Sequence, residues 1–122
     1  MPASYHIDPK VGVVFTTLTG HVTSEDFLDH QRRLRGDPDF RSTMHQCIDA
    51  RGITGGTVTG ADMRTLAKAN MYADRSRRAI IVSGRFVYGY ARMFQLLRSR
   101  GPEEIQIFRE VEDAHRWLGL VE

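Results

Sequence analysis

Residues 44–56 read Met-His-Gln-Cys-Ile-Asp-Ala-Arg-Gly-Ile-Thr-Gly-Gly, an apolar segment followed by one rich in glycine and threonine. The apolar first half predicts a short β-strand, and the second half, rich in glycine and threonine, predicts a turn. Asp49 and Arg51 would then lie where the strand becomes the turn. Open α/β sheets bind ligands outside the carboxyl ends of their strands, so this stretch predicts both a fold class and a place for a site.

Length and composition limit the possibilities. The 122 residues, 41% hydrophobic and 26% charged, suit a single packed domain over residues 1–122. The formal net charge of +2 is too small to indicate a nucleic-acid partner. A single cysteine excludes an internal disulfide and fits the reducing cytoplasm. Neither a signal peptide nor an apolar run of the roughly 20 residues that a membrane span needs is present.

The beginnings of two helices can be identified from capping signals. Thr23 precedes Asp26 by three residues, and Thr59 precedes Asp62 in the same way. Each threonine can accept a hydrogen bond from the amide three residues on, and each aspartate can accept one in return, as in a capping box. The elements expected around these helices are strands over 4–8, 11–18, 44–49, 78–83 and 105–108, and further helices over 85–100 and 111–118.

Residues 78–83 read Arg-Ala-Ile-Ile-Val-Ser, a continuous apolar run that suits a central parallel strand covered on both faces. The element order β-β-α-β-α-β-α-β-α predicts an α/β fold with one mixed, mostly parallel five-stranded sheet and four helices. The opening hairpin adds an antiparallel strand at an edge. In the helix over 85–100, we expect a core-facing stripe that consists of Phe86, Tyr90, Met93, Phe94 and Leu97.

In this order of elements the chain resembles the STAS-type fold of anti-sigma-factor antagonists, a fold placed near the CRAL-TRIO lipid-binding domains. It looks most like the small bacterial STAS-like proteins of unassigned role. The resemblance covers nearly the whole chain and is carried by residues 5–8, 47–52, 78–82 and 111–118. It implies a regulatory module that acts by protein contact.

The resemblance does not extend to the phosphorylated serine of anti-sigma-factor antagonists, which lies in an Asp-Ser-Ser-Gly type turn. Residues 51–60 contain no such turn and offer only Thr54, Thr57 and Thr59. Thr59 is already explained as a helix cap, so the sequence argues against a phosphorylation switch.

Five residues form a candidate ligand site at the rim of the sheet: Asp49, Arg51, Ser83, Arg85 and Tyr88. Two arginine forks, a hydroxyl and the amides at a helix start can hold an anion, and Tyr88 can form an apolar wall. The alternatives are that Asp49 simply pairs with Arg51 and that Ser83 caps the helix.

No catalytic or metal motif is complete. The five histidines lack the spacing of a zinc site, and Cys47 within a strand is expected to be a small buried hydrophobe. We therefore expect no enzyme activity, no cofactor and no metal. Two functions remain: a regulatory module with a protein partner, or a binder of a small anionic or amphiphilic, lipid-like ligand in a cleft between the second and third helices. A homodimer is a further expectation, because the symmetric dimer is the commonest oligomer.

Overall fold

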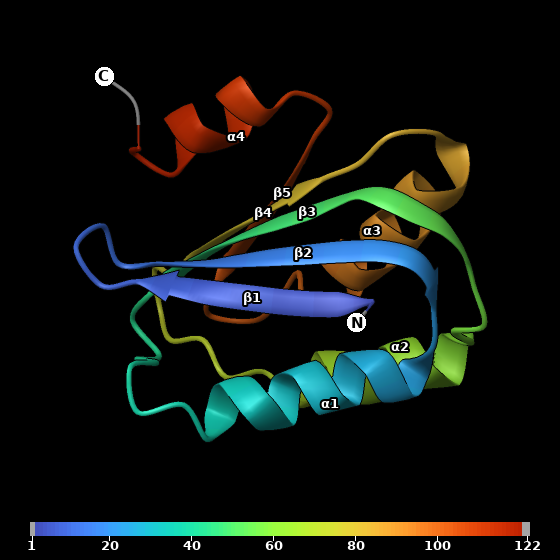
Figure 1. Cartoon of the computed structure of the whole chain (residues 1–122), viewed down its shortest axis with the longest axis horizontal. Helices are drawn as coiled ribbons and strands as arrows, with labels where there is room; N and C mark the ends of the chain where they lie inside the picture. Colours follow the sequence, from blue (N-terminus) through green and yellow to red (C-terminus); the bar gives the residue numbers. More distant parts are fainter. Residues whose placement is uncertain (1, 121–122) are drawn as a thin grey trace.

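A computed structural model of the chain describes residues 2–120. Five strands form one sheet in the order β1-β2-β3-β4-β5, and four helices connect or follow them (Figure 1). The predicted fold class and element order are confirmed. The elements are β1 (Ala3–Asp8), β2 (Val13–Val22), α1 (Ser24–Arg35), β3 (His45–Gly56), α2 (Gly60–Lys68), β4 (Arg77–Ile81), α3 (Arg85–Leu97), β5 (Glu104–Phe108) and α4 (Val111–Trp117).

The sheet is mixed, with its one antiparallel strand at an edge as predicted. β1 pairs antiparallel with β2, and β2 to β5 are all parallel. Because these four strands lie side by side in chain order, right-handed crossovers place α1, α2 and α3 on the same face of the sheet. Figure 1 shows α1 and α2 below the sheet and α4 alone above it.

Both predicted capping boxes are present. Thr23 and Thr59 each accept a hydrogen bond from the amide three residues on, and Asp26 and Asp62 accept from the cap amides in return. At the other end of α1, Gly36 takes a right-handed conformation with φ −85°, so this helix ends without a left-handed glycine. The capping box of α2 accounts for Thr59 as a structural cap.

The predicted turn after Asp49 is wrong. β3 runs for 12 residues to Gly56, and its second half pairs with an equally extended β2. The glycines reflect close approach of the two strands. A Cβ at Gly52 would lie 2.9 Å from Thr19 Cγ2, and one at Gly56 would lie 2.8 Å from the carbonyl oxygen of Val22. Glycine in a strand interior often marks such an approach.

The predicted core-facing stripe of α3 is wrong, and α2 is a short helix. α2 ends at Lys68, and Asn70 lies beyond it, where its side chain exchanges hydrogen bonds with the backbone of Tyr72 at 2.8 and 3.1 Å. In α3 the buried residues are Val87 and Ala91, and the predicted stripe is rotated away from them. Phe86, Met93 and Leu97 are exposed, while Tyr90 and Phe94 pack against α2.

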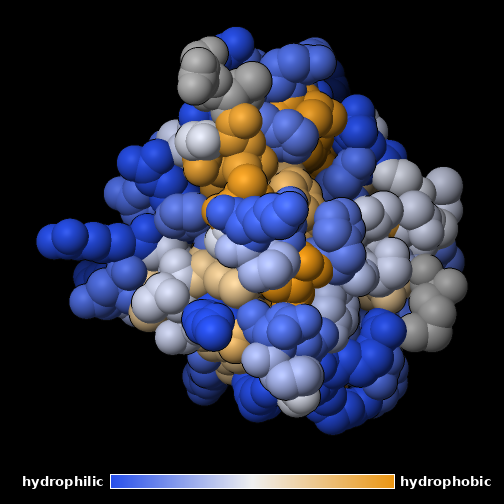
Figure 2. Space-filling model, turned by 60° about the vertical axis from the view of Figure 1, so that its left-hand side comes forward, coloured by the Kyte–Doolittle hydropathy of each residue, from blue (hydrophilic) through white to orange (hydrophobic). Residues whose placement is uncertain are grey.

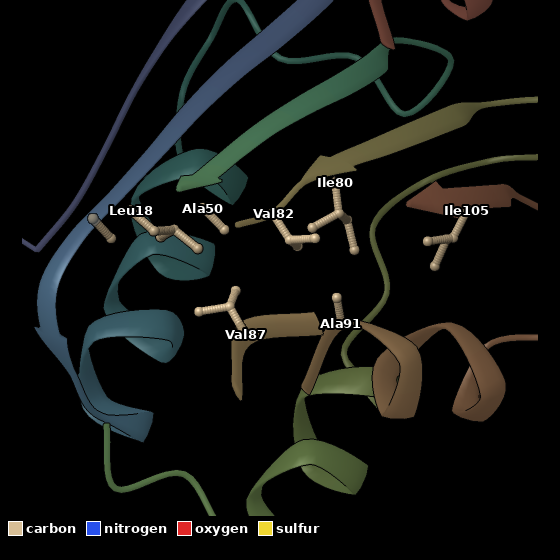
Figure 3. Packing of buried hydrophobic residues seen from close by; sticks show 8 residues of the cluster. Leu18, Ala50, Ile80, Val82, Val87, Ala91 and Ile105 are labelled. Carbon is tan, nitrogen blue, oxygen red and sulfur yellow. The ribbon is translucent and has the colours of Figure 1, made fainter. Parts of the chain in front are cut away.

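The core has a layer on each face of the sheet. On one face, Val87 and Ala91 of α3 point toward the apolar row that Leu18, Ala50 and Ile80 help to form (Figure 3). On the other face, a second cluster is formed by Val13, Cys47, Ala79, Ile81, Ala114 and Leu118. β4 lies between the two layers, and Ile80, Ile81 and Val82 are all buried as predicted.

Candidate functional site

A cavity of about 150 Å³ lies between the sheet and helices α1, α2 and α3. Most of its walls are apolar, and contributions come from all three helices and from β2, β3 and β4. Ile48 lies in the middle strand of the sheet, yet it remains only partly buried because it borders this space. Apolar residues that line the cavity include Leu18, Ala50, Met63, Leu66, Val87 and Phe94.

One end of the cavity is polar, because the adjacent strands β2, β3 and β4 each have a polar side chain at a core-facing position there. Gln46 Nε2 donates to Thr16 Oγ1 at 3.0 Å, and Gln46 Oε1 accepts from Arg78 Nε at 3.0 Å. Thr16 Oγ1 also lies 3.1 Å from Nε2 of His30 on α1. These four residues all line the cavity. Gln46 and Arg78 are each the second residue of their strand, so the polar end lies at the amino ends of β3 and β4.

Arg78 is the charged centre of this end. Its Nη1 donates to Glu103 Oε2 at 3.2 Å, and Arg98 binds the same carboxylate at 2.6 and 3.1 Å. Burial raises the pKa of Glu103, but hydrogen bonding from Arg98 and the charges of Arg78 and Arg98 outweigh this effect and keep the pKa below its ordinary value. Two guanidinium groups therefore share one carboxylate, which leaves this buried cluster with one uncompensated positive charge.

The guanidinium of Arg78 is not fully hydrogen-bonded by the protein. Among residues 2–120 it donates through Nε and Nη1, and Nη2 has no protein acceptor. Aromatic rings cover the group instead, with the ring centre of Tyr72 at 4.5 Å and that of Phe94 at 5.2 Å. Buried charged groups normally have their hydrogen bonds satisfied, so the free donors mark a place where an acceptor can bind.

Tyr72 presents a second free donor. Its side chain is 4% exposed and lines the cavity, and its hydroxyl has no hydrogen-bond partner within the described chain. Burial raises the pKa of Tyr72 to about 12, so the hydroxyl is protonated and able to donate at neutral pH. A buried hydroxyl without a partner is unusual in folded proteins. Tyr72 and Arg78, the residues that carry these two unused donors, line the same cavity.

His30 contributes no charge to the site near neutral pH. Burial lowers the pKa of His30 to about 4, and the nearby positive charges of Arg33 and Arg78 act in the same direction. The imidazole is therefore neutral at pH 7. Arg78 remains the source of positive potential at the polar end.

The rim residues predicted from the sequence lie elsewhere. Asp49 pairs in register with Ile81, the last residue of β4, and Ser83 Oγ donates to the carbonyl oxygen of Arg51 at 3.4 Å. These three residues are therefore neighbours near the carboxyl end of β4. Gln46, Ile48 and Ala50 line the cavity, so strand alternation directs Asp49 and Arg51 to the opposite, α4-bearing face.

Within the rim, Arg51 is paired with Asp49. Arg51 Nε and Nη2 donate to the two carboxylate oxygens of Asp49 at 2.9 and 2.8 Å, and this hydrogen bonding lowers the pKa of Asp49. Ser83 is not the cap of α3, because Gly84 occupies that position. Arg85 begins the helix, and the ring of Tyr88 lies 5.3 Å from the guanidinium of Arg109. A ligand at these five residues remains a prediction.

The surroundings of Cys47 and His45 do not activate the thiol. Burial raises the pKa of Cys47 to about 11, so its thiol is protonated at neutral pH. His45, two residues earlier, accepts a hydrogen bond on Nδ1 from the amide of Arg77 at 2.9 Å. Over residues 2–120, no three His, Cys, Asp or Glu side chains gather in an arrangement that could hold a metal ion.

Comparison with solved structures shows which known fold the chain has. The chain is similar to an uncharacterised protein of the DUF3478 family from Shewanella loihica PV-4, with 19% sequence identity and a TM-score of 0.64 over 95% of this chain and 91% of that one. That protein is described as having a SpoIIAA-like fold. The present chain has this fold. The likeness confirms the STAS-like architecture expected from the sequence. No protein-family model matches the chain, and no curated protein matches it.

Hydropathy varies over the surface and along the helices. Figure 2 shows a face on which hydrophilic residues predominate and apolar residues gather toward the end where α4 lies. None of the helices in the described part of the chain is long and apolar enough to span a membrane.

Proposed function

We propose that this protein binds a small anionic amphiphile, a carboxylate with an apolar body, in the cavity between the sheet and helices α1 to α3. The observation that carries this proposal is that Tyr72 and Arg78, each with an unused donor (Oη and Nη2), line a mostly apolar cavity. A carboxylate can accept from both donors at once, and charge-assisted hydrogen bonds of this kind are the strong ones.

The charge of the polar end favours a monoanion. Arg78 and Arg98 carry two positive charges and Glu103 carries one negative charge, so one further negative charge balances the cluster. A dianionic phosphate would leave excess negative charge in a buried place, which is costly. A neutral alcohol would leave the arginine uncompensated.

The volume of the cavity limits the apolar body. A cavity of about 150 Å³ lined by Leu, Ile and Phe side chains can hold a molecule the size of benzene. A ligand with its carboxylate at Arg78 therefore fits if its apolar part is a ring or a short chain. A longer chain must extend beyond the cavity.

The binding test compares two ligands that differ in the head group alone. Isothermal titration with octanoate should show binding, and 1-octanol should bind roughly 10–100-fold more weakly because it cannot form charge-assisted hydrogen bonds. The variant Ile48→Phe should fold but lose octanoate, since the larger ring fills the cavity at its middle strand. Equal affinity for the two ligands, or full binding by Ile48→Phe, would refute the proposal.

A regulatory module that acts by protein contact is the second candidate function. The STAS-like fold suggests it, and the exposed apolar residues of α3 support it. Native mass spectrometry of the purified protein separates the two candidates. A co-purified carboxylic acid supports the binder, whereas a stable complex with a protein and an empty cavity supports the contact module.

A further inference from the structure

The exposed large apolar residues of the described chain are concentrated on one helix. Six such side chains are exposed, and five of them belong to α3: Phe86, Tyr88, Met93, Leu96 and Leu97. The sixth, Val11, lies in the turn between β1 and β2. Phe86 and Leu96 are 52% and 55% exposed. Single exposed apolar residues are ordinary, but a group on one element indicates an interaction surface.

Helix geometry places most of these residues on one stripe. Phe86, Met93 and Leu97 follow spacings of seven and four residues, which align side chains along one face of a helix. Leu96 lies beside Met93 on the same exposed side, away from the buried Val87 and Ala91. α3 thus has two apolar faces, one against the core and one toward solvent.

The charge of α3 itself is of one sign, although Glu104 of β5 borders the helix beside Arg92 and Leu96. Residues 85–100 contain no aspartate or glutamate. Arg85, Arg92 and Arg100 are exposed, and none of them forms an ion pair within the described chain. A second copy of the chain docked symmetrically through this face would bring like charges together. An acidic surface has the complementary charge.

The same surface borders the cavity. Of the described residues that line the cavity, Phe86 alone is exposed. Its ring packs edge-on against Tyr90 at 5.2 Å, and the Tyr90 hydroxyl donates to the carbonyl oxygen of Val58 at 2.7 Å. An amphiphile too long for the cavity would therefore emerge beside Phe86, onto the exposed stripe.

We propose that the exposed face of α3 docks on a membrane surface that contains anionic lipids. Apolar side chains flanked by arginines on a helix that lies flat are the features by which proteins bind the interface of such a membrane. The docking depends on α3 alone. Only the passage of ligand past Phe86 rests on the proposed binding function.

Vesicle flotation tests the docking. The protein should float with vesicles of phosphatidylcholine and phosphatidylglycerol in 50 mM salt, and should not float with phosphatidylcholine alone. Met93→Ser with Leu97→Ser should weaken binding at least about tenfold. Arg85→Gln with Arg92→Gln should weaken it roughly 10–30-fold, and 0.5 M salt should reduce the wild-type binding as well.

Matched control variants lose apolar side chains or positive charges in segments that lie away from α3. Val11→Ser removes an exposed apolar side chain, and Lys10→Gln with Arg41→Gln removes two positive charges, all in segments distant from α3 in Figure 1. These variants should float like the wild type. Thermal unfolding followed by circular dichroism verifies that every variant is folded.

Two results would overturn the inference. One is flotation that is absent, or unchanged in both α3 variants. The other is a dimer or a complex with a protein that Met93→Ser with Leu97→Ser disrupts, without vesicle binding. Octanoate titration distinguishes failure of the membrane docking from failure of the proposed binding function. Octanoate binding without flotation contradicts the docking alone. Flotation without octanoate binding contradicts the binding function alone.

Discussion

The substitution Tyr72→Phe removes the hydroxyl that lacks a partner and leaves the ring in place. The buried Oη has no hydrogen bond within residues 2–120, so its removal costs none and eliminates a desolvated polar atom. We expect the free energy of unfolding of the ligand-free protein to stay the same or rise by up to about 1 kcal/mol. Urea unfolding followed by circular dichroism measures this change.

In the presence of ligand the same substitution should be harmful. If octanoate at 100 times its wild-type Kd is added, the wild type should gain about 2.7 kcal/mol. Loss of one hydrogen bond to a carboxylate raises Kd about tenfold, so the gain of Tyr72→Phe at the same octanoate concentration should be only about 1.4 kcal/mol. The ligand increment therefore halves while the ligand-free stability does not fall.

Tyr5→Phe is the matched control. The Tyr5 hydroxyl donates to Asp37 Oδ2 at 2.8 Å and lies outside the cavity, so this variant should lose about 1 kcal/mol of stability and keep the full ligand increment. Tyr72 does not donate to the ligand if Tyr72→Phe destabilises the ligand-free protein by more than about 1 kcal/mol, or if its ligand increment equals that of the wild type.

Three further predictions concern the core, the rim and the pH dependence. Ile81→Ala should lower the free energy of unfolding by about 2–5 kcal/mol in urea titrations, because Ile81 is 1% exposed in a central strand; a loss below 1 kcal/mol would mean loose packing there. Arg51→Ala with Arg85→Ala should leave the melting temperature nearly unchanged, since exposed charges contribute little; if it abolishes octanoate binding while Tyr72→Phe does not, the rim is the site. The pKa of His30 is about 4 in the folded protein against 6.5 when exposed, so the unfolded chain binds the extra proton between these values and stability should fall by about 3 kcal/mol as pH drops from 7 to 4. The variant His30→Gln should show a smaller loss over that range in urea titrations at each pH.

The fold was predictable because its signals are local. Capping boxes at Thr23 and Thr59 fixed the starts of two helices, and the apolar run over 79–82 identified a central strand. The extension of β3 to Gly56 could not be read in the same way. Its glycines resemble turn residues in the sequence, and only the closeness of β2 explains them.

The polar end of the cavity was missed because it depends on contacts between distant segments. Thr16, Gln46 and Arg78 each occupy a core-facing position of a different strand, in phase with apolar neighbours such as Leu18, Ile48 and Ile80. A polar residue at such a position is the signal that could have revealed the cluster. Its partner Glu103 and the free hydroxyl of Tyr72 emerge only in three dimensions.

The exposed half of α3 was also hidden in the sequence. Phe86, Met93 and Leu97 have the spacing of a core-facing stripe, and periodicity alone does not show which of two apolar faces meets the sheet. The face with the smaller residues Val87 and Ala91 packs on the sheet, because these side chains allow α3 to approach it closely.

A crystal structure of the protein grown with octanoate would show whether the cavity binds a carboxylate. We predict the carboxylate at about 2.7–3.2 Å from Tyr72 Oη and Arg78 Nη2, with the chain running along Ile48 toward Phe86. A carboxylate bound at Arg51 and Arg85 instead, or a cavity that stays free of octanoate at saturating concentration, would contradict it.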